Sequence, residues 1–241
     1  MVKYQSTRGH KEKLSFEDVI LSGLAPDKGL YLPDSLTIDN LNHLTEEDLS
    51  YEDFVKTIFI ALDKNSAKYV DDLSLYSGFE NSPVPVLKDL NDTTVVMELF
   101  HGPTKSFKDY ALQPLGAIAD KRLSELGERG LVLVATSGDT GSAAIQAVKD
   151  SDNIDIVVLH PANKISEYQR KQMTSVIQDN VFNIAVEGSY DDCQRIAKEI
   201  LSDNPFERRI ISLNSINWLR VVGQVSYYVW LNKQFTSPIN V

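Results

Sequence analysis

The chain has 241 residues, 42% of them hydrophobic, so it can bury the core of one large domain or two small ones. Its formal net charge of −10 disfavours non-specific binding to nucleic acid or to an anionic membrane. The single cysteine, Cys193, excludes an intramolecular disulfide and a cysteine-based zinc site, and no apolar run approaches the ~20 residues that span a bilayer. We therefore expect a cytoplasmic protein.

The first part of the chain predicts a small, mainly helical domain over residues 1–92. A helix is expected at 16–24, and a more strongly amphipathic one at 51–63, with Ser50 as its N-cap. Polar stretches rich in turn-forming residues, such as 80–83, surround these helices. This composition is typical of an accessory domain.

From residue 93 onward, expected strands alternate with expected helices. The strands cover residues 93–99, 131–135, 155–159, 181–186 and 209–213, and the helices cover 107–126, 141–148, 166–177, 190–201 and 218–234. This alternation predicts βαβ units with parallel strands, and hence an α/β domain over 93–241 with a smaller subdomain at roughly 128–213. Ligands of such sheets bind in the loops that follow the carboxyl ends of the strands.

One of these loops, Thr136-Ser137-Gly138-Asp139-Thr140-Gly141, follows the strand 131–135 and opens a helix. Its glycines allow a ligand close to the backbone, and the helix N-terminus offers N–H groups and a partial positive charge. The loop therefore predicts a site for a carboxylate or a phosphate. The alternative is a well-capped helix start, because Ser, Asp and Thr are ordinary capping residues.

A second loop, 100–109, carries Lys105 and Lys108 at another junction between a strand and a helix. A lysine in such a crevice can bind an anion or act as a Schiff-base nucleophile. The alternative is that both are solvated lysines at a helix start, paired with Asp109.

Several segments resemble, in the same order along the chain, motifs of the threonine synthase family. They are the opening segments 4–9 and 23–33, the cofactor-lysine motif 100–109, the substrate loop 136–141, and the segment 214–220 followed by Gln224. The resemblance extends over essentially the whole chain. It is specific because the motifs stand in register with one another.

The resemblance implies a pyridoxal 5'-phosphate enzyme of fold type II, similar in architecture to the tryptophan synthase β subunit. Its reaction would convert O-phospho-L-homoserine and water to L-threonine and phosphate by γ-elimination and β-addition. Lys108 would hold the cofactor covalently and then move protons at Cα and Cβ of the substrate, and Asp139 would lie near the cofactor's 3-oxygen. No metal is implied.

The resemblance also implies a set of substrate ligands. They are Thr136, Ser137, Gly138, Asp139, Thr140, Gly141, Lys105, Asn214, Ser215, Asn217 and Arg220. An arginine suits a leaving phosphate because it can donate two parallel hydrogen bonds. A surface ion pair is the alternative for Arg220.

Family members are longer, and their glycine-rich loop for the cofactor phosphate follows the third motif, whereas this chain has no glycine after Gly223. We therefore expect this chain to be the N-terminal part of the enzyme, to retain the cofactor weakly or not at all, and to be a monomer or weak homodimer. Three alternatives stay open. They are a related phospho-lyase with another phosphorylated substrate, a non-catalytic fragment that acts in assembly, and a nucleotide-binding module at 137–141.

Overall fold

The computed structural model describes residues 2–36, 48–79, 85–205 and 208–235. Its central sheet has four parallel strands in the order β7-β6-β5-β8. Their bounds are β5 Gly130–Ala135, β6 Ile154–Pro161, β7 Val181–Val186 and β8 Arg209–Ile211. The predicted α/β class with parallel strands is therefore confirmed.

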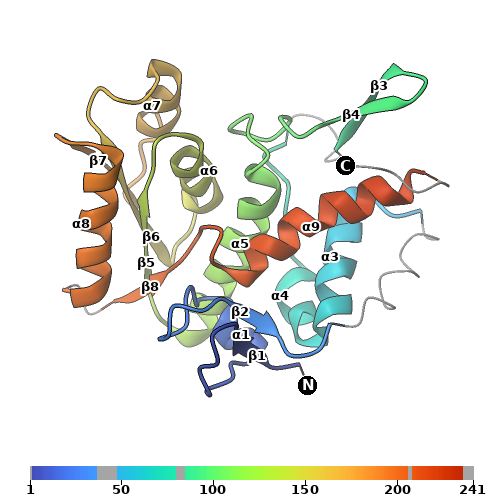
Figure 1. The fold of residues 1–241 in the computed structure, drawn as a ribbon, viewed down its shortest axis with the longest axis horizontal. Coiled ribbons are helices and arrows are strands. Elements are labelled where there is room, and N and C mark those ends of the chain that lie inside the picture. Colours follow the sequence, from blue (N-terminus) through green and yellow to red (C-terminus); the bar gives the residue numbers. More distant parts are fainter. Residues whose placement is uncertain (1, 37–47, 80–84, 206–207, 236–241) are drawn as a thin grey trace.

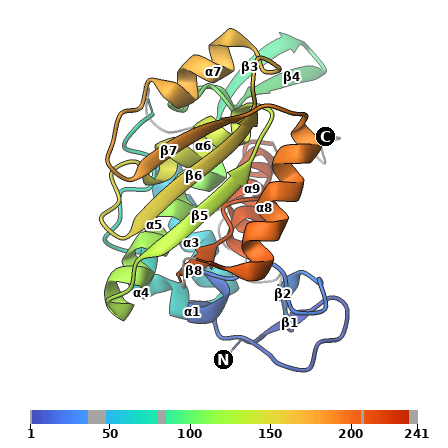
Figure 2. The ribbon, with the colours of Figure 1, turned by 90° about the vertical axis from the view of Figure 1, so that its left-hand side faces the viewer.

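Helices cover both faces of this sheet (Figures 1 and 2). The helix α8 (Tyr190–Asp203) lies on one face, and α6 (Asp139–Val148) lies on the other. On the same side of the sheet, α5 (Asp109–Leu126) packs against α6, and α9 (Trp218–Lys233) packs against α5. The short helix α7 (Glu167–Thr174) connects β6 to β7 and packs against α6.

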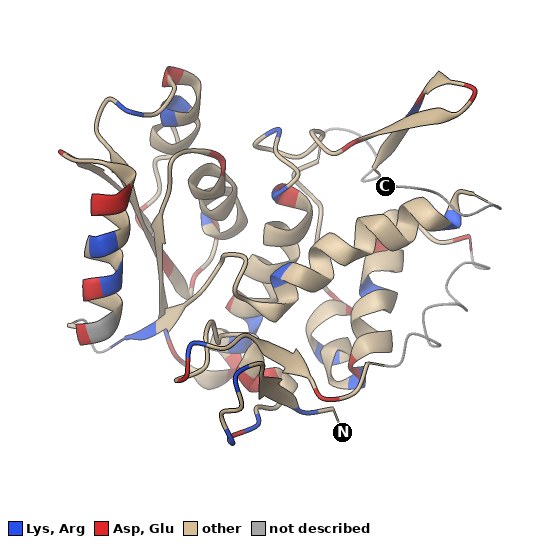
Figure 3. Cartoon of the chain, in the orientation of Figure 1, with Lys and Arg blue, Asp and Glu red and all other residues tan. Residues whose placement is uncertain are grey.

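The helix α8 separates charge from apolar surface along its length. It carries charged residues of both signs, whereas α6 and α9 carry few charges (Figure 3). On the side that faces the sheet, Cys193 and Ala197 pack against Leu159 of β6. Cys193 is fully buried there, so it is a core residue of this second, smaller apolar cluster.

The N-terminal segment folds into short elements. They are β1 Tyr4–Ser6, α1 Phe16–Val19, β2 Tyr31–Pro33, α3 Tyr51–Leu62, the 3₁₀ helix η2 Lys64–Ser66 and α4 Ala67–Val70. The predicted cap of α3 is present, because Ser50 Oγ accepts a hydrogen bond from Asp53 N at 3.1 Å. The helix predicted at 16–24 ends already at Val19. The turn-rich stretch 80–83 lies outside the described residues.

The strand predicted at 93–99 forms, as β4 (Thr94–Glu98), but it does not join the parallel sheet. It pairs antiparallel with β3 (Val86–Asn91) in a hairpin that extends away from the body of the molecule (Figure 1). A tight local turn closes this pairing at a much smaller entropic cost than a distant one. The predicted domain boundary at residue 92 falls within this turn and stays a prediction.

One continuous apolar core joins the N-terminal elements to α5, α6 and α9. Two glycines bring helix backbones unusually close within it. A Cβ on Gly116 of α5 would lie 2.4 Å from the carbonyl oxygen of Ala147 in α6, and one on Gly223 of α9 would lie 2.7 Å from Ala111 Cα in α5. The start of α5 is therefore held by two neighbouring helices.

Candidate functional site

The candidate site lies where two parallel helices begin. Lys108 immediately precedes α5, and Asp139 is the first residue of α6. Lys108 Nζ and Asp139 Oδ2 are 3.6 Å apart. Because each helix carries a partial positive charge at its N-terminus, the two starts together favour an anionic ligand.

The Lys108 amine is partly buried, with 19% of its side chain exposed. Its Nζ lies 4.6 Å from the centroid of the Phe107 ring, within the range of a cation–π contact. An aromatic face on one side and the Asp139 carboxylate on another restrict where the amine can point. Lys105, by contrast, is exposed and has a backbone φ of +60°.

The loop 136–141 is organised around the buried side chain of Thr136. Its Oγ1 accepts hydrogen bonds from Gly138 N at 3.0 Å and from Gly141 N at 3.3 Å. A Cβ on Gly141 would lie 2.6 Å from Thr136 Cγ2, so a larger residue would push the loop apart. Within the described residues, the N–H groups of Asp139 and Thr140 have no hydrogen-bond partner and can receive an anion.

Arg220 and Asp109 form a buried charged layer beneath Lys108. Arg220 is 5% exposed and donates through Nη1 to the Lys108 carbonyl oxygen at 3.2 Å. Asp109 is fully buried and accepts from Thr104 N at 2.8 Å and Thr104 Oγ1 at 2.7 Å. Burial lowers the pKa of the Arg220 guanidinium and raises the pKa of the Asp109 carboxyl, although the hydrogen bonds from Thr104 oppose the second shift.

The segment 214–217 is engaged elsewhere. Asn217 Oδ1 accepts from Leu219 N at 2.9 Å, and its Nδ2 donates to the carbonyl oxygens of Ile20 and Ser22 at 2.9 and 3.1 Å. Asn214 Oδ1 accepts from the backbone N of residue 216 at 2.9 Å, and the neighbouring Ser215 is exposed. Among the described residues, the structure shows no contact from these three side chains to Lys108.

The predicted site residues therefore divide into two groups. Lys108, Asp139, Arg220 and the loop 136–141 come together at the starts of α5, α6 and α9. The remaining candidates lie outside this cluster. Gln169 and Gln172 of α7 are not among the predicted site residues, although their spacing of three residues places them on one helix face after β6. Both contact the site loops.

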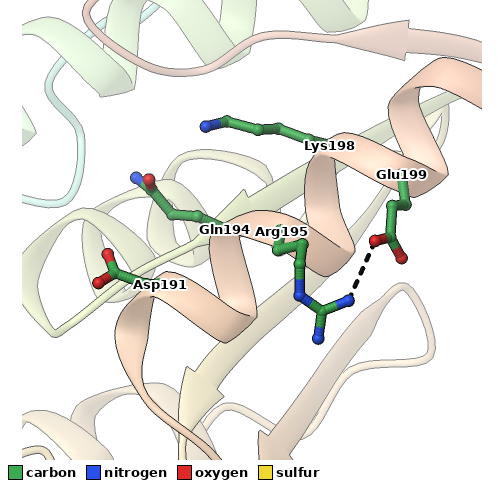
Figure 4. Close-up of a pocket in the computed structure, with 5 residues that line it drawn as sticks. All are labelled: Asp191, Gln194, Arg195, Lys198 and Glu199. Atoms are coloured by element: carbon green, nitrogen blue, oxygen red, sulfur yellow. Dashed lines mark hydrogen bonds and ion pairs between the residues drawn. The ribbon is translucent and has the colours of Figure 1, made fainter.

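The other surfaces considered are less suited to bind a ligand. The depression drawn in Figure 4 is lined by Asp191, Gln194, Arg195, Lys198 and Glu199, all from α8, and Arg195 pairs with Glu199. A single solvated helix face offers a ligand no enclosure. Within the described ranges, no group of three or more His, Cys, Asp or Glu side chains could hold a metal ion. None of the helices there has the length and apolar character that crossing a bilayer requires.

Comparison with known proteins finds that this chain is similar to proteins named threonine synthase. Residues 3–69 match the family model described as threonine synthase N terminus. The chain is 43% identical to the threonine synthase of Pseudomonas aeruginosa, over 98% of this chain and 52% of that protein.

Two solved structures share the fold. The pyridoxal-phosphate-bound threonine synthase of Brucella melitensis aligns with 99% of this chain and 53% of its own, at 37% identity and a TM-score of 0.88. The yeast threonine synthase aligns with 97% of this chain and 50% of its own, at 33% identity and a TM-score of 0.84. The predicted resemblance is therefore confirmed, and the chain spans about half the length of the curated relatives it matches.

Proposed function

We propose that this chain is part of a pyridoxal-phosphate-dependent threonine synthase of fold type II. The enzyme would be a carbon–oxygen lyase acting on phosphates, converting O-phospho-L-homoserine and water to L-threonine and inorganic phosphate. The observation that carries the proposal is the position of Lys108, whose amine stands between the starts of α5 and α6 and beside an uncommitted anion loop. The similarity to proteins named threonine synthase supports it.

The residues present fit the cofactor. A partly exposed amine is available for a covalent bond at Lys108, and N–H groups at the start of α6 are available for an acidic group. Arg220 makes one hydrogen bond within the described residues, so other guanidinium donors remain for an anion. When bound, pyridoxal phosphate withdraws electrons from Cα of an amino acid and so stabilises a carbanion there.

Lys108 then serves as the proton carrier. Its amine would take a proton from Cα and from Cβ of the substrate, which allows the Cγ–O bond to break and phosphate to leave. Water adds its hydroxyl to Cβ, and protons return to Cα and Cγ. Phe107 and Asp139 limit the positions of Nζ, and this restriction keeps the amine near the carbons that exchange protons.

The anionic ends of the substrate would be held by different elements. We assign the carboxylate to the loop 136–141, where the helix start offers N–H groups. We assign the phosphate to Arg220 and Lys105, with Asn214 and Ser215 as further ligands. Asn217 would reach a phosphate only by giving up its bonds to the N-terminal segment.

The test is covalent labelling. The longest form of the protein that expresses would be incubated with pyridoxal phosphate, reduced with borohydride and mapped by peptide mass spectrometry. We expect the phosphopyridoxyl group on Lys108, its loss in Lys108→Ala, and its retention in the matched control Lys105→Ala. Label elsewhere but not on Lys108 would refute the assignment. Turnover of O-phospho-L-homoserine would then give threonine, whereas accumulation of a 2-oxo acid would indicate a phospho-lyase.

We also propose that the enzyme acts in the cytoplasm on a small molecule, as a monomer or weak homodimer. The net charge of −10 disfavours binding to nucleic acid or to an anionic membrane, and Cys193 is buried outside any disulfide, as expected of a protein in a reducing compartment. Light scattering coupled to size-exclusion chromatography would give the molar mass. A stable trimer or larger assembly would contradict this part of the proposal.

A further inference from the structure

The helix α7 contacts the site through the side-chain amide of Gln169, whose oxygen and nitrogen each make a hydrogen bond. Gln169 Oε1 accepts a hydrogen bond from Ser166 Oγ at 3.0 Å, at the N-cap of α7. Gln169 Nε2 donates to Asp139 Oδ1 at 2.7 Å. Because the serine hydroxyl donates to the amide oxygen, the amide nitrogen faces the Asp139 carboxylate.

The same side chain lies directly on the anion loop. A Cβ on Gly138 would be 2.3 Å from Gln169 Nε2 and 2.4 Å from its Cδ. Any residue larger than glycine at 138 would displace the glutamine from the carboxylate. Gly138 therefore gives Gln169 access to Asp139, in addition to shaping the loop.

One turn further along α7, Gln172 contacts the other site loop. Its Nε2 donates to the Thr104 carbonyl oxygen at 2.8 Å. Thr104 is in turn bonded through its N and Oγ1 to Asp109, the first residue of α5. Residues three apart share a helix face, so one face of α7 is bonded to both the lysine loop and the anion loop.

The two Asp139 oxygens have different partners. Oδ1 accepts from Gln169, and Oδ2 faces Lys108 Nζ at 3.6 Å. The Asp139 side chain is 46% exposed, so without the first bond it is free to turn toward solvent. The bond from Gln169 therefore determines which way the carboxylate points relative to the amine.

We propose that Gln169 and Gln172 are positioning residues, and that α7 acts as a clamp that fixes Asp139 against Lys108. The clamp itself rests on the geometry of these residues, and its relevance to the reaction rests on the proposed role of Lys108. In this proposal α7, in which Met173 is the buried residue, serves mainly to position Asp139.

The competing explanation is purely structural, with the Gln169–Asp139 bond serving only to hold α7 on the body of the protein. A double swap separates the two. In Asp139→Asn/Gln169→Glu the bond can re-form with the donor and acceptor exchanged, so the anchoring is kept. The carboxylate, however, now sits on α7 and no longer on the residue that faces Lys108.

The experiment compares wild type, Gln169→Leu, Gln172→Leu and the double swap. A matched control is Gln194→Leu, which removes a glutamine bond to Tyr190 on α8. Two quantities are measured in each protein. The first is amide hydrogen exchange at residues 136–141 and 104–108, and the second is the share of phosphopyridoxyl label on Lys108 among all lysines after borohydride reduction.

In Gln169→Leu we expect at least threefold faster exchange at Gly138 and Gly141. The share of label on Lys108 should fall about two- to fivefold, the size expected for a half-exposed ion pair. Gln172→Leu should raise exchange at 104–108, and the control should change neither quantity. The double swap should restore slow exchange while the Lys108 share stays low.

Three results would overturn the clamp. The first is a double swap that restores both quantities, since the bond would then be structural only. The second is fast exchange in the double swap, and the third is unchanged exchange in Gln169→Leu, since in either case the bond would not hold the loop. A wild-type protein without label on Lys108 would refute the proposed function, and the exchange data would still decide whether α7 holds the loops.

Discussion

Replacing Asn217 with alanine should loosen α9 from the segment that follows α1. The Asn217 side chain is 1% exposed and uses both ends of its amide. Its oxygen caps α9 at Leu219 N, and its nitrogen bridges the carbonyl oxygens of Ile20 and Ser22. Alanine removes the cap and both bridging bonds at once, and it leaves the Ile20 carbonyl buried without this donor.

The expected cost follows from these three bonds. Loss of an N-cap costs about 1 kcal/mol of the free energy of unfolding. Each lost hydrogen bond to a buried carbonyl costs about 1 kcal/mol more. The sum is about 3 kcal/mol. For a chain of this size that corresponds to a fall in melting temperature of roughly 6–12 °C.

The assay is guanidinium unfolding followed by tryptophan fluorescence. The chain has two tryptophans, Trp218 and Trp230, and both lie on α9, so the signal reports the helix whose attachment is changed. Asn217→Ser is the matched control, because serine keeps the cap but not the bridge, and we expect it to lose about 2 kcal/mol. An alanine variant within about 0.5 kcal/mol of wild type would refute the reasoning. If such a variant bound phosphate more weakly, Asn217 would be a substrate ligand instead.

Two further substitutions test the buried surroundings of Lys108. Burial raises the pKa of the Asp109 carboxyl above its usual 3.8. The folded protein therefore binds the carboxyl proton more tightly than the unfolded chain does. As a result, the free energy of unfolding should fall as the pH rises from 3.8 through the raised pKa. Asp109→Asn should remove that part of the fall in urea titrations at a series of pH values, and parallel curves for the two proteins would contradict it. Gly223→Val should lower the free energy of unfolding by at least about 2 kcal/mol, because the valine side chain would clash with Ala111 Cα and push α9 away from α5. The exposed control Val225→Ala should stay within about 0.5 kcal/mol.

The sequence predicted most reliably the elements with a strong repeating pattern. The apolar, β-branched run at 131–135 became β5 with one extra residue at its start, and 181–186 became β7 without change. Apolar, β-branched runs of this kind are typical of strands in a parallel sheet, so their composition identifies them, although β7 lies at the sheet edge and leaves Phe182 and Ile184 about half exposed. The strands β1 and β2, with three residues each, are too short to show any period. The strand β3 has a weak sequence signal because Lys88 and Asp89 interrupt its apolar residues.

The candidate site, too, could be predicted only where a sequence pattern marks it. The loops with Lys108 and Asp139 could be located because each follows a predicted strand. Only the loop with Asp139 lies at the carboxyl edge of the parallel sheet, after β5, whereas β4 pairs outside that sheet, and the packing of α5 against α6 brings Lys108 to Asp139. The burial of Arg220 could not be predicted, since it depends on how α9 crosses α5. The contact of Gln169 with Asp139 could not be predicted either, because a glutamine in a short helix has no periodic signal, and its partner is 30 residues away.

The close contact between Gly116 and Ala147 has a consequence for how the site can change. Each lies eight residues after its site residue, Lys108 or Asp139, which is about 12 Å along a helix. The helices α5 and α6 are therefore in close backbone contact at one point, and the Lys108 amine and the Asp139 carboxylate lie at their N-terminal ends. A methyl group added at Gly116 would push the two helices apart and change the distance between the amine and the carboxylate. The distance between the Lys108 amine and the Asp139 carboxylate is therefore set in part by residues that touch neither, so a substitution at Gly116 or Ala147 can change the site without contacting it.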